Sequence, residues 1–289
     1  MKRIALTGGN GFLASRFRKL YGQTYEILPI CRSAGCPGCV ESDYSVAQLT
    51  ELFSGCDAVL HLAYQKAAAA NERCGLRAYA PSMEMTENVL QAAAASGVKN
   101  VVFTSSRCVY GDHTDTAFRE DDPLHPINYY GVSKAAMEQL CEYYSRKNGL
   151  HVKVLRLGQI IGDAANAGSL VNTFLDRCRR DEPLKLIGRS ERDYIYVDDV
   201  CLALCAAIEH DSCQGIYNIG MGRGLSNREI AATLIDLLQS HSTVAAENGA
   251  ESRIVLDCEK AQRELDFTCW YDSFEKIAAM LVAAEQNGR

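Results

Sequence analysis

The chain lacks several features that would place it in common functional classes. Its 30 lysines and arginines are outnumbered by 36 aspartates and glutamates, which leaves a net charge of -6 and a pI near 5.6. No cluster of arginines with interleaved aromatic residues occurs, so the sequence offers no basic face of the kind that follows a nucleic-acid backbone. No apolar run approaches the roughly 20 residues that cross a bilayer. We therefore expect neither a nucleic-acid partner nor a membrane span.

We also expect no secretory signal, because residues 1–6 have the pattern of a strand. The 13 cysteines are scattered over predicted strands and helices, so we expect reduced thiols and a cytoplasmic protein. Cys36 and Cys39 form a Cys-Pro-Gly-Cys run near Cys31, an arrangement that suits a zinc corner or a redox pair. No second Cys-x-x-Cys follows at a metal-ligand spacing, so we expect no metal.

The first half of the sequence alternates between apolar strands and helices. Strands are predicted at residues 3–7, 26–31, 58–62, 101–105 and 152–157, and helices at 12–20, 46–53, 82–95 and 129–147. Strands that are apolar throughout and are separated by helices indicate a parallel sheet that is covered on both faces. The fold class is therefore α/β, with a doubly wound parallel sheet whose ligands bind at the carboxyl ends of the strands.

After Gly162 this alternation weakens. Helices are predicted at 170–180 and 227–238, strands at 184–186 and 216–219, and a strand with a following helix at 194–208. Ser226 and Glu229 form a capping box for the helix at 227–238. We predict a dinucleotide-binding domain at 1–162, to which residues 192–214 return, and a smaller mixed α/β substrate-binding lobe at 163–289. No Pro/Gly/Ser-rich linker separates the two parts, so they should share one core.

A glycine-rich loop joins the first strand to the first helix. Its glycines are read as Gly8-x-x-Gly11-x-x-Ala14, or with Gly9 in place of Gly8. Glycines let the backbone approach a pyrophosphate, and the amino end of the helix supplies N–H donors and a positive dipole end. We assign Gly8, Gly11, Phe12 and Leu13 to a dinucleotide site.

The end of the second strand bears on the choice of cofactor. An acidic residue there would bind the 2′-hydroxyl of NAD, whereas this chain has Arg32 and Ser33. An arginine with a neighbouring hydroxyl suits a 2′-phosphate, so we favour NADP, with NAD as the alternative. Arg32 would otherwise be an ordinary exposed cation. Asp43 is a candidate for binding the adenine amine, or else a solvated loop carboxylate or helix cap.

Tyr130 and Lys134 are the most informative residues of the chain. A spacing of four residues places the phenol and the ammonium on one face of a helix, so the cation should lower the pKa of the phenol from its usual value near ~10. Ser106, at the end of the strand at 101–105, can hold a substrate oxygen beside Tyr130. The three residues form a candidate proton-handling set. The alternative is a half-buried helix aromatic with a solvated lysine, which the glycine-rich loop disfavours.

These motifs together resemble the extended short-chain dehydrogenase/reductase family, which includes the sugar-nucleotide epimerases and dehydratases. The resemblance covers nearly the whole chain and rests on several segments. They are Thr7-Gly8-Gly9-Asn10-Gly11-Phe12, His61-Leu62-Ala63, Ser105-Ser106-Arg107-Cys108-Val109-Tyr110-Gly111, Tyr130-Gly131-Val132-Ser133-Lys134, Arg192-Asp193-Tyr194-Ile195-Tyr196-Val197-Asp198-Asp199-Val200 and Ile216-Tyr217-Asn218-Ile219-Gly220.

The resemblance implies a role for particular side chains. Tyr130 would exchange the proton, Lys134 would hold the nicotinamide ribose, and Ser106 would bind the reacting oxygen. Ala63 would lie against the cofactor, and Leu62 and Tyr44 are assigned to the same site. Arg192 or Arg253 would bind the diphosphate of a nucleotide sugar. The helices at 82–95 and 129–147 resemble those that pair in dimeric relatives, so a homodimer is expected, although their burial against the sheet alone is an alternative.

Two positions in the candidate substrate site depart from the family pattern. Gln159 follows Arg156-Leu157-Gly158 where many members have Arg-Pro-x-Asn, and Arg107 follows Ser106 where dehydratases have an acidic pair. A 4,6-dehydratase is thus disfavoured, and Arg107 either favours an anionic substrate or faces solvent. Three functions remain open: an epimerase of a nucleotide-linked sugar, a reductase or dehydrogenase of such a sugar or of another carbonyl compound, and a non-catalytic NADP-binding sensor.

Overall fold

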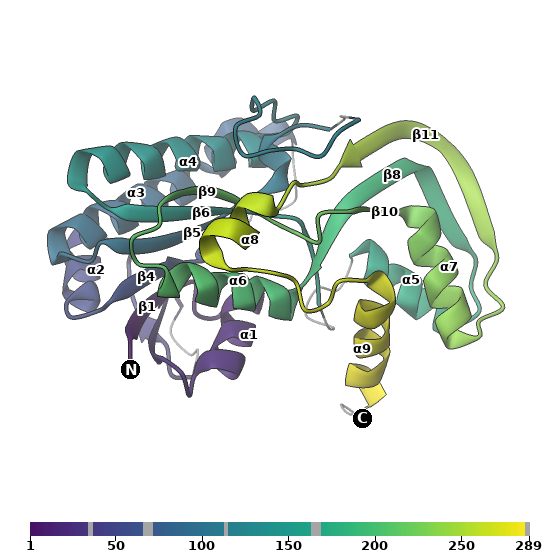
Figure 1. Ribbon diagram of the computed structural model, residues 1–289, viewed down its shortest axis with the longest axis horizontal. Coiled ribbons are helices and arrows are strands. Elements are labelled where there is room, and N and C mark those ends of the chain that lie inside the picture. Colours follow the sequence, from purple (N-terminus) through teal and green to yellow (C-terminus); the bar gives the residue numbers. More distant parts are fainter. Residues whose placement is uncertain (34–36, 66–71, 113–114, 163–168, 287–289) are drawn as a thin grey trace.

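The computed structural model describes residues 1–33, 37–65, 72–112, 115–162 and 169–286 (Figure 1). Its main element is a seven-stranded sheet in which neighbouring strands are parallel. In spatial order the strands are β3 (Val40–Glu41), β2 (Glu26–Cys31), β1 (Arg3–Thr7), β4 (Ala58–His61), β5 (Asn100–Ser106), β6 (His151–Leu157) and β9 (Gly215–Ile219). The chain order reverses direction between β1 and β4, and such a switch point is where open α/β sheets bind ligands.

Both faces of this sheet are covered by helices, as the apolar strands predict. Ile4 and Leu6 of β1 belong to the core on one face, whereas Ala5 belongs to the core on the other. Alternate side chains of a strand point to opposite faces, so all three must be apolar. The first face is covered by α1 (Phe12–Tyr21), α6 (Val197–Glu209) and α8 (Glu259–Leu265), and the second by α2 (Val46–Phe53), α3 (Ala80–Ser96) and α4 (Tyr129–Asn148). The predicted fold class is confirmed.

A smaller mixed sheet with its own helices extends from one end of the large sheet (Figure 1). Its strands are β7 (Gln159–Ile161), β8 (Leu184–Tyr196), β10 (Gly224–Ser226) and β11 (Val244–Ile254). The helices α5 (Leu170–Arg179), α7 (Asn227–Leu238) and α9 (Phe274–Gln286) pack with β8 in a separate apolar core. Ser226 and Glu229 form the predicted capping box of α7. Two short 3₁₀ helices, η1 (Glu72–Ala78) and η2 (Arg107–Val109), complete the described elements.

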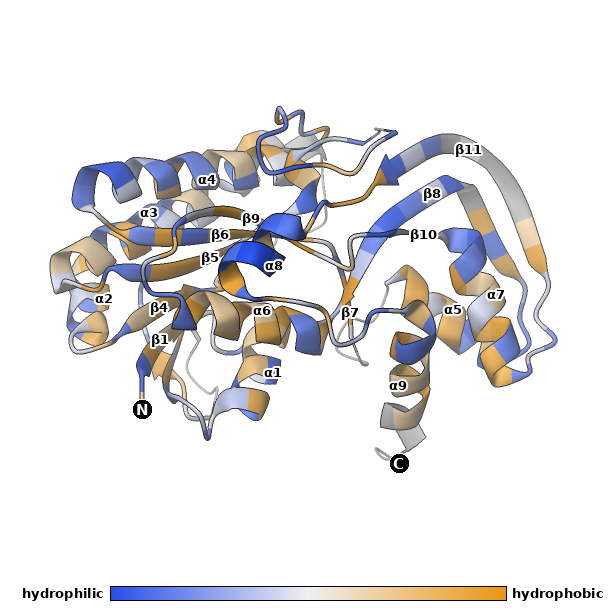
Figure 2. Cartoon of the chain, in the orientation of Figure 1, coloured by the Kyte–Doolittle hydropathy of each residue, from blue (hydrophilic) through white to orange (hydrophobic). Residues whose placement is uncertain are grey.

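The strand β8 is much longer than the sequence pattern predicts. Leu184 and Leu186 are apolar and residues 194–196 are apolar or aromatic, but polar residues such as Arg189 and Glu191 separate them. Parallel pairing with β11 continues through this polar stretch, where the Arg189 side chain is 88 % exposed. Figure 2 shows hydrophilic residues along the middle of β8, where the strand bends away from the large sheet. Backbone pairing therefore sustains the middle of this strand, residues 188–192, without buried side chains.

The segment that returns to the large sheet is longer than residues 192–214. The helix α6 packs into the core on the α1 face, β9 pairs with β6 at the edge of the sheet, and α8 packs on β9. The chain thus crosses between the two parts several times. None of the helices in the described ranges combines the length and the apolar character needed to span a bilayer.

Candidate active site

The loop between β1 and α1 lies against the turn that follows β4. Gly8 has a φ of +75°, and a Cβ at this residue would come within 2.8 Å of the Ala63 backbone. Gly11 is the N-cap residue of α1, so no side chain caps the N–H groups of the first helical turn, which begins with Phe12 and Leu13. These N–H groups and the positive end of the helix dipole suit a pyrophosphate. The loop therefore has the backbone geometry that a dinucleotide requires.

A buried tyrosine, Tyr44, links this loop to the strand β2 by hydrogen bonds. The Tyr44 hydroxyl accepts a hydrogen bond from the Gly8 N–H at 3.0 Å and donates one to the Ile30 carbonyl at 3.1 Å. Tyr44 has a φ of +61°, and burial raises the pKa of its phenol to about 12. The preceding Asp43 is exposed, and its carboxylate accepts a hydrogen bond from the Ser45 N–H at 2.7 Å. Asp43 thus closes a local turn, which matches the alternative given for it above.

Arg32 and Ser33 lie at the carboxyl end of β2, beside the glycine loop. Arg32 is exposed, and its Nη1 donates a hydrogen bond to the Gln65 side chain at 2.8 Å. The Asn10 side chain donates to the Ser33 hydroxyl at 3.3 Å. Because the Gln65 side chain is neutral, it does not compensate the positive charge of the Arg32 guanidinium, which can attract an anion at this edge of the sheet. Its position is compatible with a 2′-phosphate.

The turn after β4 is tied to the end of β1. Leu62 N–H donates to the Thr7 carbonyl at 3.3 Å, and Ala63 N–H lies 3.4 Å from the Thr7 hydroxyl. These bonds hold Leu62 and Ala63 beside Gly8, on the side of the sheet's carboxyl edge where the cofactor is expected.

Ser106, Tyr130 and Lys134 come together at the carboxyl end of β5. The Ser106 oxygen accepts a hydrogen bond from the Cys108 N–H at 3.2 Å. The Ser106 hydroxyl also lies close enough to the Tyr130 phenol to contribute to lowering its pKa. Lys134 lies one turn after Tyr130 on α4, and its Nζ donates to the Thr104 carbonyl at 2.8 Å. The three side chains thus meet as the sequence predicts, although they come from two elements that the fold alone brings together.

The charge states of these groups differ from the expectation. Burial raises the pKa of Tyr130 to about 12, and the Ser106 hydroxyl and the charge of Arg107 offset only part of this effect. Burial also lowers the pKa of Lys134 to about 8. The Lys134 ammonium lies 6.0 Å from the centre of the Tyr130 ring and hydrogen-bonds the backbone instead. The prediction that this ammonium makes the phenol acidic is wrong for the protein without cofactor, because loss of water dominates.

Aromatic rings that the sequence analysis missed surround the lysine. The Lys134 Nζ lies 4.5 Å from the centre of the Tyr64 ring and 4.9 Å from that of Phe103. Tyr64 also contacts Tyr130 edge to face, with ring centres 5.4 Å apart. Tyr64 directly follows Ala63 at the carboxyl end of a central strand, and that position was the available signal.

A buried ion pair supports the site from behind. The Arg156 Nη2 lies 2.8 Å from a carboxylate oxygen of Glu138, and both side chains are almost completely buried. The same carboxylate accepts a hydrogen bond from the Ser105 hydroxyl. Glu138 lies one turn after Lys134 on α4, so the pair joins the helix that carries Lys134 to the strands β5 and β6. Arg156 therefore supports the fold, as the resemblance implies.

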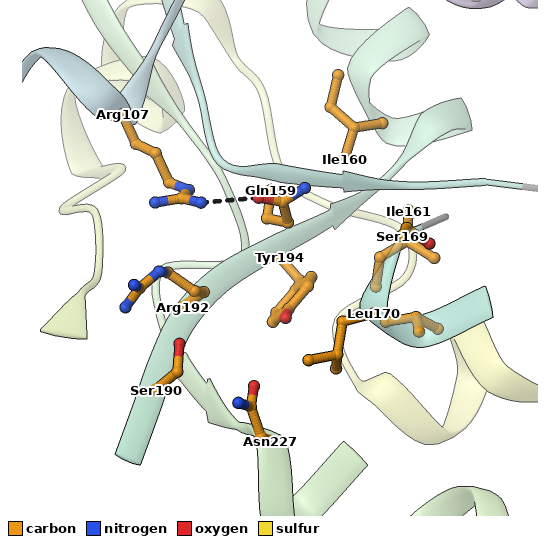
Figure 3. Close-up of a pocket in the computed structure, with 11 residues that line it drawn as sticks. Arg107, Gln159, Ile160, Ile161, Ser169, Leu170, Ser190, Arg192, Tyr194 and Asn227 are labelled. Carbon is orange, nitrogen blue, oxygen red and sulfur yellow. Dashed lines mark hydrogen bonds between the residues drawn. The ribbon is translucent and has the colours of Figure 1, made fainter. Parts of the chain in front are cut away.

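A pocket of about 330 Å³ lies among β7, β8 and the first residues of α5 and α7, and it is also lined by Arg107 of η2 (Figure 3). Its lining includes Arg107, Gln159 and Arg192, which are three of the four residues that the sequence analysis assigned to the substrate. The other lining residues, which the sequence analysis missed, are Ile160, Ile161, Ser169, Leu170, Val171, Ser190, Tyr194 and Asn227. Arg107 directly follows Ser106, so the pocket begins one residue from the catalytic candidates. Arg107 is only 9 % exposed and thus does not face solvent.

Arg253, the fourth predicted substrate residue, does not line this pocket. Its Nε donates to the Glu191 carboxylate at 3.2 Å, and its Nη1 donates to the Thr116 carbonyl at 3.1 Å. Arg253 thus ties β11 to β8 and to the loop that contains Thr116. Arg192 is held at the pocket by the Ser252 carbonyl, at 2.7 Å from its Nη1.

The candidate metal or redox pair falls partly outside the described residues, which exclude Cys36. Cys39 is described, and its sulfur lies 3.5 Å from Nη1 of Arg18, which also donates to the Gly9 carbonyl at 3.2 Å. Arg18 thus connects this segment to the glycine loop.

Comparisons with known proteins agree with this geometry. The model of the NAD dependent epimerase/dehydratase family matches residues 4–220. A UDP-glucose 4-epimerase from Azospirillum brasilense is 28 % identical over 99 % of this chain and 92 % of its own length. A dTDP-glucose 4,6-dehydratase from Streptomyces antibioticus is 33 % identical over 67 % of this chain. The alignments with this dehydratase and with two further curated relatives span only 56 to 60 % of those proteins' lengths.

The fold is also that of solved members of the same family. The structure of a UDP-N-acetylglucosamine 4-epimerase from Bacillus cereus superposes with a TM-score of 0.88, at 28 % identity, over 99 % of this chain and 97 % of that one. The family model covers about three quarters of the sequence and includes the glycine loop, Ser106, Tyr130 and Lys134. The chain therefore belongs to the NAD dependent epimerase/dehydratase family.

Proposed function

We propose that the chain is an NAD(P)-dependent epimerase or reductase that acts on a nucleotide-linked sugar through Ser106, Tyr130 and Lys134. The observation that carries this proposal is the meeting of these three side chains at the sheet edge, between a glycine loop with a free helix terminus and a pocket that contains two arginines. The first feature suits a dinucleotide and the second suits a diphosphate.

Each of the three residues has a distinct role in the proposed reaction. Because the Cys108 N–H occupies the Ser106 oxygen, the serine proton is available to the Tyr130 phenol or to a substrate oxygen. Tyr130 exchanges a proton with the sugar hydroxyl or ketone, and Lys134 binds the ribose of the cofactor. A bound nicotinamide would supply the hydride or accept it, and its positive charge when oxidised would favour the phenolate.

The pocket indicates how the substrate is held. We propose that Arg192 binds the diphosphate and that Gln159 and Arg107 lie at the sugar, since Arg107 adjoins Ser106. A volume of about 330 Å³ is at the small end of the range for ligand pockets, about 300–1,000 Å³. A smaller carbonyl substrate without a nucleotide is therefore the second candidate.

The catalytic assignment is tested by Tyr130→Phe, assayed with nucleotide sugars while the absorbance of reduced nicotinamide is followed. Isomerised product without a net change in absorbance identifies an epimerase, and a net change identifies a reductase or dehydrogenase. Tyr130→Phe should abolish either activity and leave cofactor affinity nearly unchanged. Full activity in this variant would refute the role of Tyr130, and a wild type that binds cofactor but turns over no carbonyl or sugar would support the sensor.

We further propose that NADP is preferred over NAD, because Arg32 lies at the end of β2 with a neutral partner and no carboxylate occupies positions 31–33. Removal of a charge-assisted hydrogen bond costs about 1.5–3 kcal/mol, so Arg32→Ala should weaken NADP binding about 10- to 100-fold and leave NAD binding unchanged. Lys19→Ala, at the far end of α1, is the control. A clear preference of the wild type for NAD would contradict this proposal.

We also keep the expectation of a cytoplasmic homodimer that pairs α3 and α4. Tyr143, on α4, is 49 % exposed, which leaves an aromatic side chain available on this helix. Light scattering of the purified protein measures the assembly, and a monomer at micromolar concentration would reject it.

A further inference from the structure

Arg107 is a buried cation whose direct partner is neutral. Its Nη2 donates to the Gln159 side-chain oxygen at 2.7 Å, and within the described residues no carboxylate forms an ion pair with it. A buried charge is costly unless an opposite charge and hydrogen bonds compensate for it. Within a pocket next to Ser106, this arrangement indicates that a ligand supplies the opposite charge.

The nearby carboxylates do not supply it. Asp112 lies 3.5 Å from Nη2 of Arg192, so it forms an ion pair with the second arginine of the pocket and not with Arg107. Asp193 is fully buried and accepts hydrogen bonds from the backbone N–H groups of residues 221, 222 and 256. Burial raises the pKa of the Asp193 carboxyl to about 7, and the charge of Arg107 lowers it only in part, without an ion pair between the two side chains. Burial lowers the pKa of Arg192, and the charge of Arg107 lowers it further, as expected for two cations that share a pocket. The pocket therefore has an excess of positive charge.

The two arginines lie at different places along the pocket (Figure 3). Arg107 directly follows Ser106, one of the catalytic candidates, whereas Arg192 lies on β8 beside Ser190. Arg107 and Gln159 are in direct contact. A guanidinium and an amide thus lie side by side in the pocket, next to Ser106.

We propose that Arg107 and Gln159 bind a carboxylate on the sugar itself, so that the substrate is a nucleotide-linked uronate. This inference rests on the proposed function, in which Arg192 holds the diphosphate. A guanidinium with an adjacent amide can present several N–H donors to the two oxygens of a carboxylate. A neutral hydroxymethyl group at the same place would leave the cation without a counter-charge.

The test is calorimetric titration of the Tyr130→Phe protein, loaded with cofactor, with UDP-glucose and with UDP-glucuronate. These two probes differ only in the carboxylate. The same titrations are made with Arg107→Ala, Arg107→Lys and Gln159→Leu added. Arg192→Ala measures the contribution of Arg192 to binding the diphosphate. Arg189→Ala, which changes an exposed arginine of the same strand, is the matched control. Cofactor binding by each variant verifies that it is folded.

The parent protein should bind UDP-glucuronate about 10- to 100-fold more tightly than UDP-glucose, as expected for charge-assisted hydrogen bonds. Arg107→Ala should remove this preference and leave the affinity for UDP-glucose within about three-fold, while Arg107→Lys and Gln159→Leu retain part of it. Arg192→Ala should weaken the binding of both ligands by the same factor. Equal binding of the two sugars by the parent protein overturns the inference while the proposed function stands.

A second result would also overturn it. If Arg107→Ala weakens both ligands equally, both arginines serve the diphosphate, and the sugar needs no carboxylate. Failure to bind either nucleotide sugar, with cofactor binding intact, rejects the nucleotide-sugar function and this inference with it.

Discussion

Replacement of Lys134 by methionine should abolish catalysis and yet stabilise the protein near neutral pH. The Lys134 side chain is 4 % exposed, and burial lowers its pKa from 10.5 to about 8. At about 1.4 kcal/mol per pH unit, holding the ammonium in this site at pH 7 costs about 3 kcal/mol of folding free energy. Methionine has a similar length and no charge, so it removes this cost.

The hydrogen bond to the Thr104 carbonyl sets the opposing effect. Its loss leaves a backbone acceptor without that donor and costs about 1–2 kcal/mol. Lys134→Met should therefore unfold with a free energy about 1–2 kcal/mol higher than that of the wild type at pH 7. A stability gain at the expense of activity is common where a functional site holds a buried charge.

The dependence on pH distinguishes this explanation from simple repacking. The unfolded chain binds more protons at Lys134 than the folded protein between about pH 8 and 10.5, so the cost is full below this window and vanishes above it. The advantage of Lys134→Met should thus shrink by about 2 kcal/mol between pH 7 and pH 10. Urea unfolding at both pH values measures it, with Lys147→Met, an exposed lysine of α4, as the control. If the variant is less stable than the wild type at pH 7, by an amount that does not change with pH, the explanation that a desolvated ammonium destabilises the folded protein is refuted.

Three further changes have outcomes that follow from contacts in the structure. Gly8→Ala forces a side chain into a positive φ and against the Ala63 backbone, so cofactor affinity measured by fluorescence titration should fall at least about 10-fold, whereas unchanged affinity would contradict the tight loop. Glu138→Ala leaves Arg156 buried without its counter-charge and should lower the free energy of unfolding, measured in urea, by about 3–5 kcal/mol. A decrease below about 1 kcal/mol would contradict the role of this ion pair. Ser226→Ala removes the capping box of α7 and should cost about 1 kcal/mol by the same measurement, with no change in cofactor binding.

The alternation of apolar strands and helices predicted the large sheet closely, because a strand buried on both faces must be apolar at every position. The bounds of β1, β2, α2 and α7 agree with the prediction. The smaller lobe was less predictable: β8 runs through polar residues that are held by backbone pairing with β11, and β7, β10, β11 and α9 were not anticipated. Neither was α8, which packs on the large sheet. A strand whose side chains face solvent has no hydrophobic period to reveal it.

The sequence by itself determined which residues carry the candidate chemistry, because Gly8, Ser106, Tyr130 and Lys134 stand in motifs whose spacing reflects local backbone geometry. Tertiary structure alone decided their electrostatic state and their neighbours. Burial raises the pKa of Tyr130 and lowers that of Lys134, and the degree of burial depends on rings and strands that are distant in the chain. The contact between Arg107 and Gln159 likewise joins residues 52 positions apart, since parallel strands bring separate segments to one edge of the sheet.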